Sequence, residues 1–218
     1  MNRTVILEVE LAETYVPNMF PRSFWERQLA IDPERELHRS YELFHIWLNK
    51  PFFVSKAVEL NPFNSTMFAW SDIGCYRNTV YNNKRWLIAT HLVPEENLLA
   101  MAISRPRRPA GTHLLTKHYN ASTGEWFMGG TQLIGYSDVW RHFANAYEKV
   151  IRQYHDAGIF LGDDQPVLQM TCHTAGLCEF VTPEQVIGDP YFGLQEILHF
   201  GNVTPPWYSM ANEYVRPG

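Results

Sequence analysis

The feature that most constrains this chain is an apolar run that ends in an acid and a glycine. Residues 67–70 read Met-Phe-Ala-Trp, and Ser71, Asp72 and Gly74 follow. A strand that delivers a carboxylate at its carboxyl end, followed by a glycine turn, is how open α/β sheets build ligand sites. Glycine permits a positive φ or a close approach of a ligand to the backbone. The stretch predicts a ligand site around Asp72, with a simple turn cap as the alternative role of this acid.

The totals favour one globular domain over residues 1–218. The chain has 218 residues, 45% hydrophobic and 14% aromatic, and we find no repeat or linker. The net charge of −5 argues against nucleic acid as a main partner. No apolar run reaches the roughly 18 residues of a transmembrane helix. Three cysteines form an odd count without framework spacing, which favours a reducing, cytoplasmic location.

Periodicity predicts helices and strands in alternation, and therefore a mixed α/β fold. The predicted strands cover residues 4–11, 67–70, 86–90, 98–103 and 177–181, with two short strands around the glycine pair in 125–135. The predicted helices cover about 32–49, 53–58, 137–158 and 163–175. The tail from residue 198 is aromatic and proline-rich, without clear periodicity.

Three further positions are candidates for chemistry. Asp163 and Asp164 adjoin a predicted helix start, where capping needs only one of them, and the other is then available as a general base. His199 is either a satisfied core residue or a ligand, because its segment is irregular and contains glycine. Gly129 and Gly130 either let a sugar approach the backbone or form a tight turn.

The residue types around Asp72 suit a hard divalent cation. Mg²⁺ and Mn²⁺ need few protein ligands when a bound diphosphate supplies the remaining oxygens. Asp72 and one distant ligand are then sufficient. Zinc is disfavoured, because Cys172, His173 and Cys178 lack a second ligand pair.

At this point the sequence resembles a known family. Residues 46–54 (IWLNKPFFV), 61–63 (NPF) and 68–77 (FAWSDIGCYR) together resemble the HtrL/YibB-like group of glycosyltransferases. In that group a W-x-D-x-G-x-x-R segment stands where other GT-A enzymes carry the D-x-D metal motif. Residues 127–135 and 162–165 are similar to the glycine-pair segment and the acidic helix start of the group. The resemblance covers roughly residues 40–170.

The tail is separately similar to the H-F-x-G-x-x-K-P-W ending of glycogenin-like and galactosyltransferase-like GT-A enzymes. The histidine of that motif is a metal ligand, and the lysine meets the diphosphate. Here Gly201 comes one place early and Pro205 stands where the lysine would be. The similarity therefore carries His199 over as a metal ligand but supplies no phosphate-binding lysine.

The resemblance implies a GT-A-like mixed, mostly parallel sheet flanked by helices. The first nucleotide-binding βα units of such a fold are either missing here or replaced by the short N-terminus. It also implies a nucleotide-sugar donor, a glycan or protein acceptor, and Mn²⁺ or Mg²⁺ held by Asp72 and His199. The alternative is a non-catalytic sugar- or nucleotide-binding or assembly module that retains the fold.

The glycosyltransferase hypothesis gives each candidate residue a role. Asp163 and Asp164 are the catalytic acids that activate or orient the acceptor hydroxyl. The expected substrate-binding residues are Arg77 for the phosphates, Gly129 and Gly130 for the sugar, and Trp70, Trp126 and Trp207 for stacking.

Overall fold

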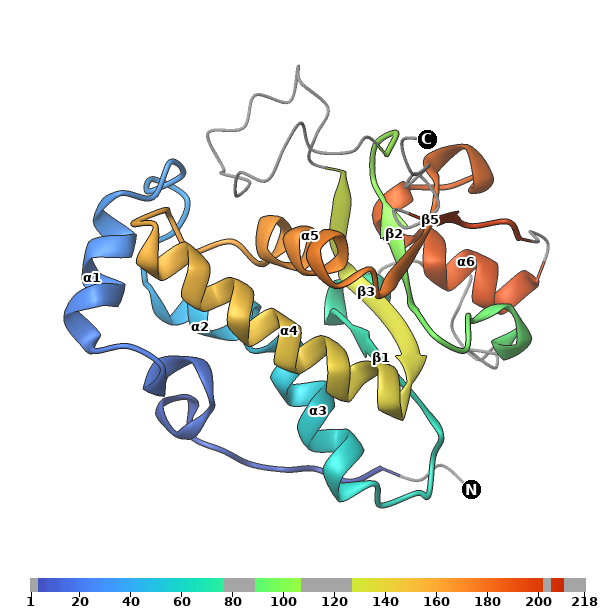
Figure 1. Ribbon diagram of the computed structural model, residues 1–218, viewed down its shortest axis with the longest axis horizontal. Coiled ribbons are helices and arrows are strands. Elements are labelled where there is room, and N and C mark those ends of the chain that lie inside the picture. The colour runs from blue at the N-terminus through green and yellow to red at the C-terminus, as the bar shows by residue number, and fades with distance from the viewer. Residues whose placement is uncertain (1–3, 77–88, 107–126, 202–204, 210–218) are drawn as a thin grey trace, which may run out of the picture.

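The centre of the molecule is one five-stranded sheet (Figure 1). The computed structural model describes residues 4–76, 89–106, 127–201 and 205–209. The strands lie in the order β1-β3-β2-β4-β5. Their bounds are β1 Met67–Ser71, β2 Leu98–Ala102, β3 Met128–Tyr136, β4 Cys178–Val181 and β5 Tyr208–Ser209. The mixed α/β class predicted from the sequence is confirmed.

The expectation of a mostly parallel sheet is wrong for the strands that the structure describes. Only β2 and β4 pair in parallel, whereas β1–β3, β2–β3 and β4–β5 are antiparallel. The glycine pair is not a turn between two short strands, because Gly129 and Gly130 lie inside the nine-residue β3. This long strand runs back between β1 and β2 and makes both of those pairings antiparallel.

Both faces of the sheet are covered. Side chains alternate along β2, so Leu98, Ala100 and Ala102 join one apolar cluster, and Leu99 and Met101 join another. All five β2 residues are buried, as expected for a central strand between two packed layers. We call the two clusters the larger core and the smaller core.

Five helices surround the larger core. They are α1 Arg22–Ala30, α2 Glu42–Leu48, α3 Lys50–Leu60, α4 Ser137–Asp156 and α5 Asp164–Ala175. The long helix α4 crosses this side of the molecule in Figure 1. Its apolar stripe, which includes Trp140, Phe143 and Tyr147, is buried as its 3.6-residue period predicted.

One helix covers the smaller core from the opposite face. Helix α6, Gly193–Phe200, contributes Leu194, Ile197 and Leu198 to this cluster, and the Trp207 ring packs with them. In Figure 1, α6 lies on the other side of β2 from α4 and α5. The sequence pattern did not predict α6, because its eight residues give fewer than three helical turns of periodicity.

The N-terminal part differs most from the sequence-based expectation. Residues 4–10 form no regular structure and are exposed, so the predicted strand over 4–11 is wrong. This segment pairs with none of the five strands that the structure describes. Of the predicted helix over 32–49, only α2 forms as a helix before a new one starts at Lys50. Most of the predicted strand over 86–90 lies outside the described residues.

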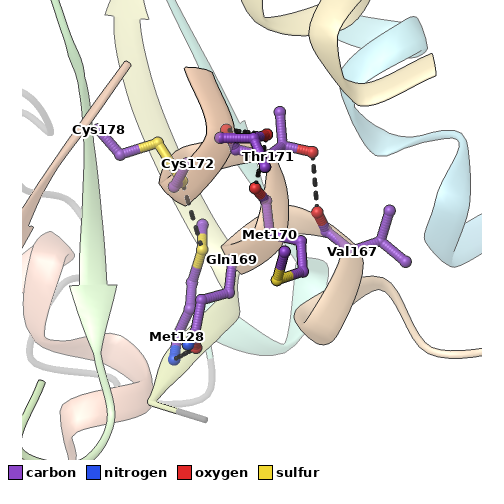
Figure 2. The surroundings of a disulfide bond; sticks show 8 residues. Met128, Val167, Gln169, Met170, Thr171, Cys172 and Cys178 are labelled. Carbon is purple, nitrogen blue, oxygen red and sulfur yellow. Dashed lines mark hydrogen bonds between the residues drawn. A yellow bond between two sulfur atoms is a disulfide. The ribbon is translucent and has the colours of Figure 1, made fainter. Parts of the chain in front are cut away.

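A disulfide joins the end of α5 to the start of β4 (Figure 2). Cys172 and Cys178 form this bond, with their Cα atoms 5.1 Å apart, while Cys75 is free and buried. The odd cysteine count without framework spacing favoured a reducing compartment, and the observed pairing of two cysteines removes that support. The cytoplasmic location therefore stays a prediction.

None of the described helices combines the length and the apolar character that crossing a lipid bilayer requires.

Candidate functional site

Asp72 follows β1 directly, as its sequence position predicted. Its backbone N–H donates to the carbonyl of Thr131 at 2.8 Å, which extends the β1–β3 pairing by one step. The Trp70 indole Nε1–H donates to Asp72 Oδ1 at 2.7 Å. The Asp72 side chain keeps 31% of its surface exposed. The carboxylate is therefore oriented by a neighbour and still open to a ligand.

The residue that organises the site is Lys50, which sequence reasoning did not single out. It is the first residue of α3, and Pro51 after it suits the first helical turn. Its Nζ lies 3.2 Å from both Asp72 oxygens, 2.9 Å from the carbonyl oxygen of Gly130 and 2.7 Å from Asp164 Oδ2. The side chain is only 5% exposed. Fully buried lysines almost always have charged partners, and Lys50 has two.

Asp164 joins Asp72 at Lys50, although 91 residues separate them in the chain. Asp163 caps α5, because its Oδ1 accepts from the backbone N–H of Gln165 at 3.2 Å. Asp164 begins the helix, and its carboxylate is 6% exposed. Among the described residues, its Oδ2 has no hydrogen-bond partner besides the Lys50 ion pair, whose geometry is that of close charges rather than an aligned hydrogen bond.

Gly130 makes room for this acid. A Cβ on Gly130 would lie 2.6 Å from Asp164 Oδ2, which real Cβ atoms do not tolerate. A Cβ on Gly129 would instead meet the end of the Ile103 side chain, at 2.9 Å. Gly130 therefore lets α5 bring its first carboxylate against β3, a role that neither sequence-based alternative for the glycine pair contained.

Burial and charge oppose each other in this group. Burial raises the pKa of Asp164 to about 7, although Lys50 pulls it down. Burial lowers the pKa of Lys50, but the negative charges of Asp164 and Asp72 outweigh it, so the pKa lies above its ordinary value. Lys50 thus stays protonated at neutral pH, while Asp164 exchanges its proton close to neutrality.

A cleft of about 710 Å³ opens beside Asp72. Asp72, Gly74, Thr131 and Lys50 line it on the side of the sheet. Its aromatic lining consists of Trp47, Trp70, Tyr191 and Phe192. The Thr131 hydroxyl donates to the Tyr191 carbonyl, which ties the segment before α6 to β3. Aromatic faces around a few polar groups are typical of a site for a flat or ring-shaped polar ligand.

The other predicted site residues have separate places. His199 is 9% exposed and lies six residues after Gly193, about 9 Å along α6 at 1.5 Å per residue. The N-terminal end of this helix adjoins the cleft, and the role of His199 as a metal ligand stays a prediction. Trp207 is 6% exposed in the smaller core, and its Nε1 donates to the Leu92 carbonyl at 3.0 Å. Arg77 and Trp126 lie outside the described residues.

The donor set fits a divalent metal only as a site with few protein ligands. The described residues contain no group of three or more His, Cys, Asp or Glu side chains placed to hold a metal ion. Asp72 offers a partly exposed carboxylate, and a carboxylate has about four lone-pair positions for its partners. Mg²⁺ and Mn²⁺ accept such a site when waters and substrate phosphates complete the coordination.

The chain gives no significant match to any protein-family model, curated protein or solved structure.

Proposed function

We propose that the protein is a glycosyltransferase of the GT-A type that uses Mn²⁺ or Mg²⁺. It would move a sugar from a nucleotide-sugar donor to a hydroxyl group of a glycan or protein acceptor. The observation that carries this proposal is the convergence of Asp72 and Asp164 on Lys50 beside an aromatic cleft. The sequence resemblance points to the same two acids on grounds that are independent of their proximity.

Each part of the site has a role in this reaction. Asp72 would hold the metal, which neutralises charge on the departing diphosphate when it is bound. Trp70 and Trp47 offer faces against which a sugar or base can pack. The bond between the anomeric carbon and the donor phosphate oxygen breaks, and that oxygen keeps the electron pair. A new bond forms from the anomeric carbon to the acceptor oxygen.

Asp164 is the better of the two adjacent acids for the acceptor proton. Asp163 is engaged as the cap of α5, whereas Asp164 contacts Lys50 of the cleft lining and its pKa is about 7. A general base is most effective when its pKa lies near the working pH. The acceptor hydroxyl proton would therefore pass to the Asp164 carboxylate. Arg77 remains the proposed partner of the phosphates.

Thermal shift with nucleotide-sugars tests this proposal. UDP-, GDP- and CMP-sugars are added with and without Mn²⁺, and a rise in Tm is expected for one donor only when the metal is present. Asp72→Asn should abolish the rise. Asp138→Asn is the matched control, because this acid is 81% exposed on α4, and it should respond like the parent chain. A chain that responds to no donor in the presence of Mn²⁺ is not a glycosyltransferase of this kind.

A second candidate is a sugar- or nucleotide-binding module without catalysis. The observation that favours it is the ion pairing of Lys50 with both acids, which lowers their availability to a metal and an acceptor. The two candidates differ in turnover. A module of this kind gives a metal-independent thermal shift and releases no nucleoside diphosphate from any donor.

A further inference from the structure

Three oxygen-bearing groups from three elements meet around the ammonium group of Lys50. Asp72 follows β1, Gly130 lies in β3 and Asp164 begins α5. Their oxygens lie 3.2, 2.9 and 2.7 Å from Nζ. The Asp72 and Gly130 oxygens accept hydrogen bonds from the ammonium, and Asp164 Oδ2 pairs with it as a close opposite charge.

The same arrangement of oxygens would suit a divalent cation. Two carboxylates and one backbone carbonyl are the hard ligands that Mg²⁺, Mn²⁺ and Ca²⁺ prefer. The three groups belong to separate parts of the fold, and the ammonium group of Lys50 lies between them. Lys50 borders the cleft but is only 5% exposed, so its ammonium is held by these neighbours rather than by water.

We propose that Lys50 is a positioning residue that serves as a built-in cation between Asp72 and Asp164. It keeps a divalent metal from using both carboxylates at once. A metal then binds Asp72 only from the cleft side, and Asp164 remains free of metal for the acceptor hydroxyl. The part of this inference that concerns the metal and the acceptor rests on the proposed function.

The positive charge of Lys50 explains why replacing this residue should change the affinity for a divalent metal. The three side chains of the group carry a net charge of −1 when Lys50 is protonated and both acids are ionised. A divalent ion between the acids would meet the positive Lys50 at contact distance, and the low dielectric of the interior strengthens that repulsion. When a neutral side chain replaces Lys50, this opposing charge is gone, and a metal ion that enters the oxygen-lined gap takes the place of any proton on Asp164.

The test is a Mn²⁺ titration of Lys50→Gln in the absence of any nucleotide-sugar. Electron paramagnetic resonance measures the concentration of unbound Mn²⁺ at each step. Lys50→Gln should bind Mn²⁺ at least about tenfold more tightly than the parent chain, since an opposing charge is removed at close range. Adding Asp164→Asn to Lys50→Gln should cancel the gain. The matched control is Lys56→Gln, an exposed lysine of the same helix, which should leave Mn²⁺ binding unchanged.

Equal or weaker Mn²⁺ binding by Lys50→Gln overturns the proposal. If this variant does not fold in metal-free buffer, refolding with and without Mn²⁺ decides. Recovery that depends on Mn²⁺ supports the built-in cation, and failure in both conditions contradicts it. In the parent background, Asp164→Asn should leave Mn²⁺ affinity nearly unchanged, and a loss as large as that of Asp72→Asn also overturns the proposal.

The outcome is separable from that of the proposed function. A parent chain that responds to no nucleotide-sugar with Mn²⁺ would end the glycosyltransferase proposal. Tighter Mn²⁺ binding by Lys50→Gln would still establish that Lys50 fills a cation position between the two acids.

Discussion

At the scale of single residues, the site depends on Gly130 having no side chain. The Gly130 backbone supplies a carbonyl to Lys50 and leaves the space that the Asp164 carboxylate fills. Neither function needs a positive φ, so the usual reason for glycine does not apply here. The requirement for glycine is steric, and it connects the middle of β3 to the first turn of α5.

Gly130→Ala should lower the free energy of unfolding by about 1–3 kcal/mol, the usual range for overpacking a buried site. The new methyl would lie 2.6 Å from a carboxylate that Lys50 holds in place, so the acid has little freedom to move. Urea denaturation measures the loss. Gly129→Ala is the matched control and should cost less, because its one close contact would be with the γ2 methyl of the partly exposed Ile103. Equal losses would contradict the account of Gly130.

His45 should make the protein less stable in mild acid. Burial lowers its pKa to about 4, with Glu42 opposing the shift, and its Nε2 has no hydrogen-bond partner among the described residues. The unfolded chain binds this proton near pH 6.5. Between about pH 6.5 and 4 the unfolded state therefore holds more protons, and the free energy of unfolding falls as the pH falls.

His45→Gln removes this difference in proton binding. Urea midpoints measured across that pH window should fall less steeply in the variant than in the parent chain. Below about pH 4 the contribution of His45 is constant, because both states are protonated. Parallel curves for the two chains across the window would show that His45 does not carry the effect.

At the scale of elements, α5 is fastened at three points along its length. Its first turn reaches Lys50 through Asp164, its middle meets β3 through Gln169, and its end is bonded to β4 through Cys172 (Figure 2). Gln169 Oε1 accepts from the backbone N–H groups of Phe127 and Met128, at 2.8 and 3.1 Å. A side chain of α5 therefore satisfies the backbone N–H groups at the start of β3.

Gln169→Leu should destabilise the protein by about 2–6 kcal/mol. The change keeps the side-chain size but leaves two buried N–H groups without this acceptor, and each costs about 1–3 kcal/mol. Calorimetry or urea denaturation measures the loss. Gln153→Leu makes the same chemical change at an exposed position of α4 and should alter stability little. A loss in Gln169→Leu no greater than in this control would contradict the role of Gln169.

At the scale of the whole molecule, the sheet belongs to both cores. Leu98 and Leu99 are neighbours in β2, yet one packs in the larger core and the other in the smaller core. If the helices that cover either core came away, one face of the same five-stranded sheet would be exposed. This shared sheet is the physical reason to treat residues 1–218 as one domain, which remains a prediction.

Unfolding should consequently occur in one transition. Leu99→Ala, which removes packing from the smaller core, should lower the stability by about 2–5 kcal/mol. Tryptophan fluorescence should report this loss together with far-UV circular dichroism, because Trp25 and Trp140 lie in the larger core and Trp207 in the smaller one. Fluorescence and circular dichroism midpoints that separate in the variant would indicate two independently stable units.

The parts of the fold that sequence could predict were those with local signals. Helix α4 has a long apolar stripe, and α5 has an aspartate cap and a glycine in the left-handed conformation at its end. Strand β1 and the acid after it were also found in this way. Strand pairing was not, because antiparallel and parallel neighbours are chosen by contacts between distant segments.

Only part of the candidate site could be predicted from the sequence, for a related reason. Acids at a strand end and at a helix start follow recognisable patterns, and Asp72 and Asp164 were found through them. A lysine is ordinarily exposed, so its residue type alone does not predict that Lys50 is buried. The available clue was its place in the apolar stretch Trp47 to Phe53, which leaves a long polar side chain few directions to take.

The contact of Lys50 with two acids also constrains how this site can change during evolution. Loss of the lysine alone leaves two acids without their cation, and loss of Asp164 alone leaves part of a buried ammonium without its partner. Substitution of one member of this group alone therefore lowers stability, whereas simultaneous replacement of both charged partners does not. In a set of descendants of this chain, positions 50, 130 and 164 should vary together or stay fixed together. A lineage that has given up the lysine should also have lost Asp164 or acquired a side chain at position 130.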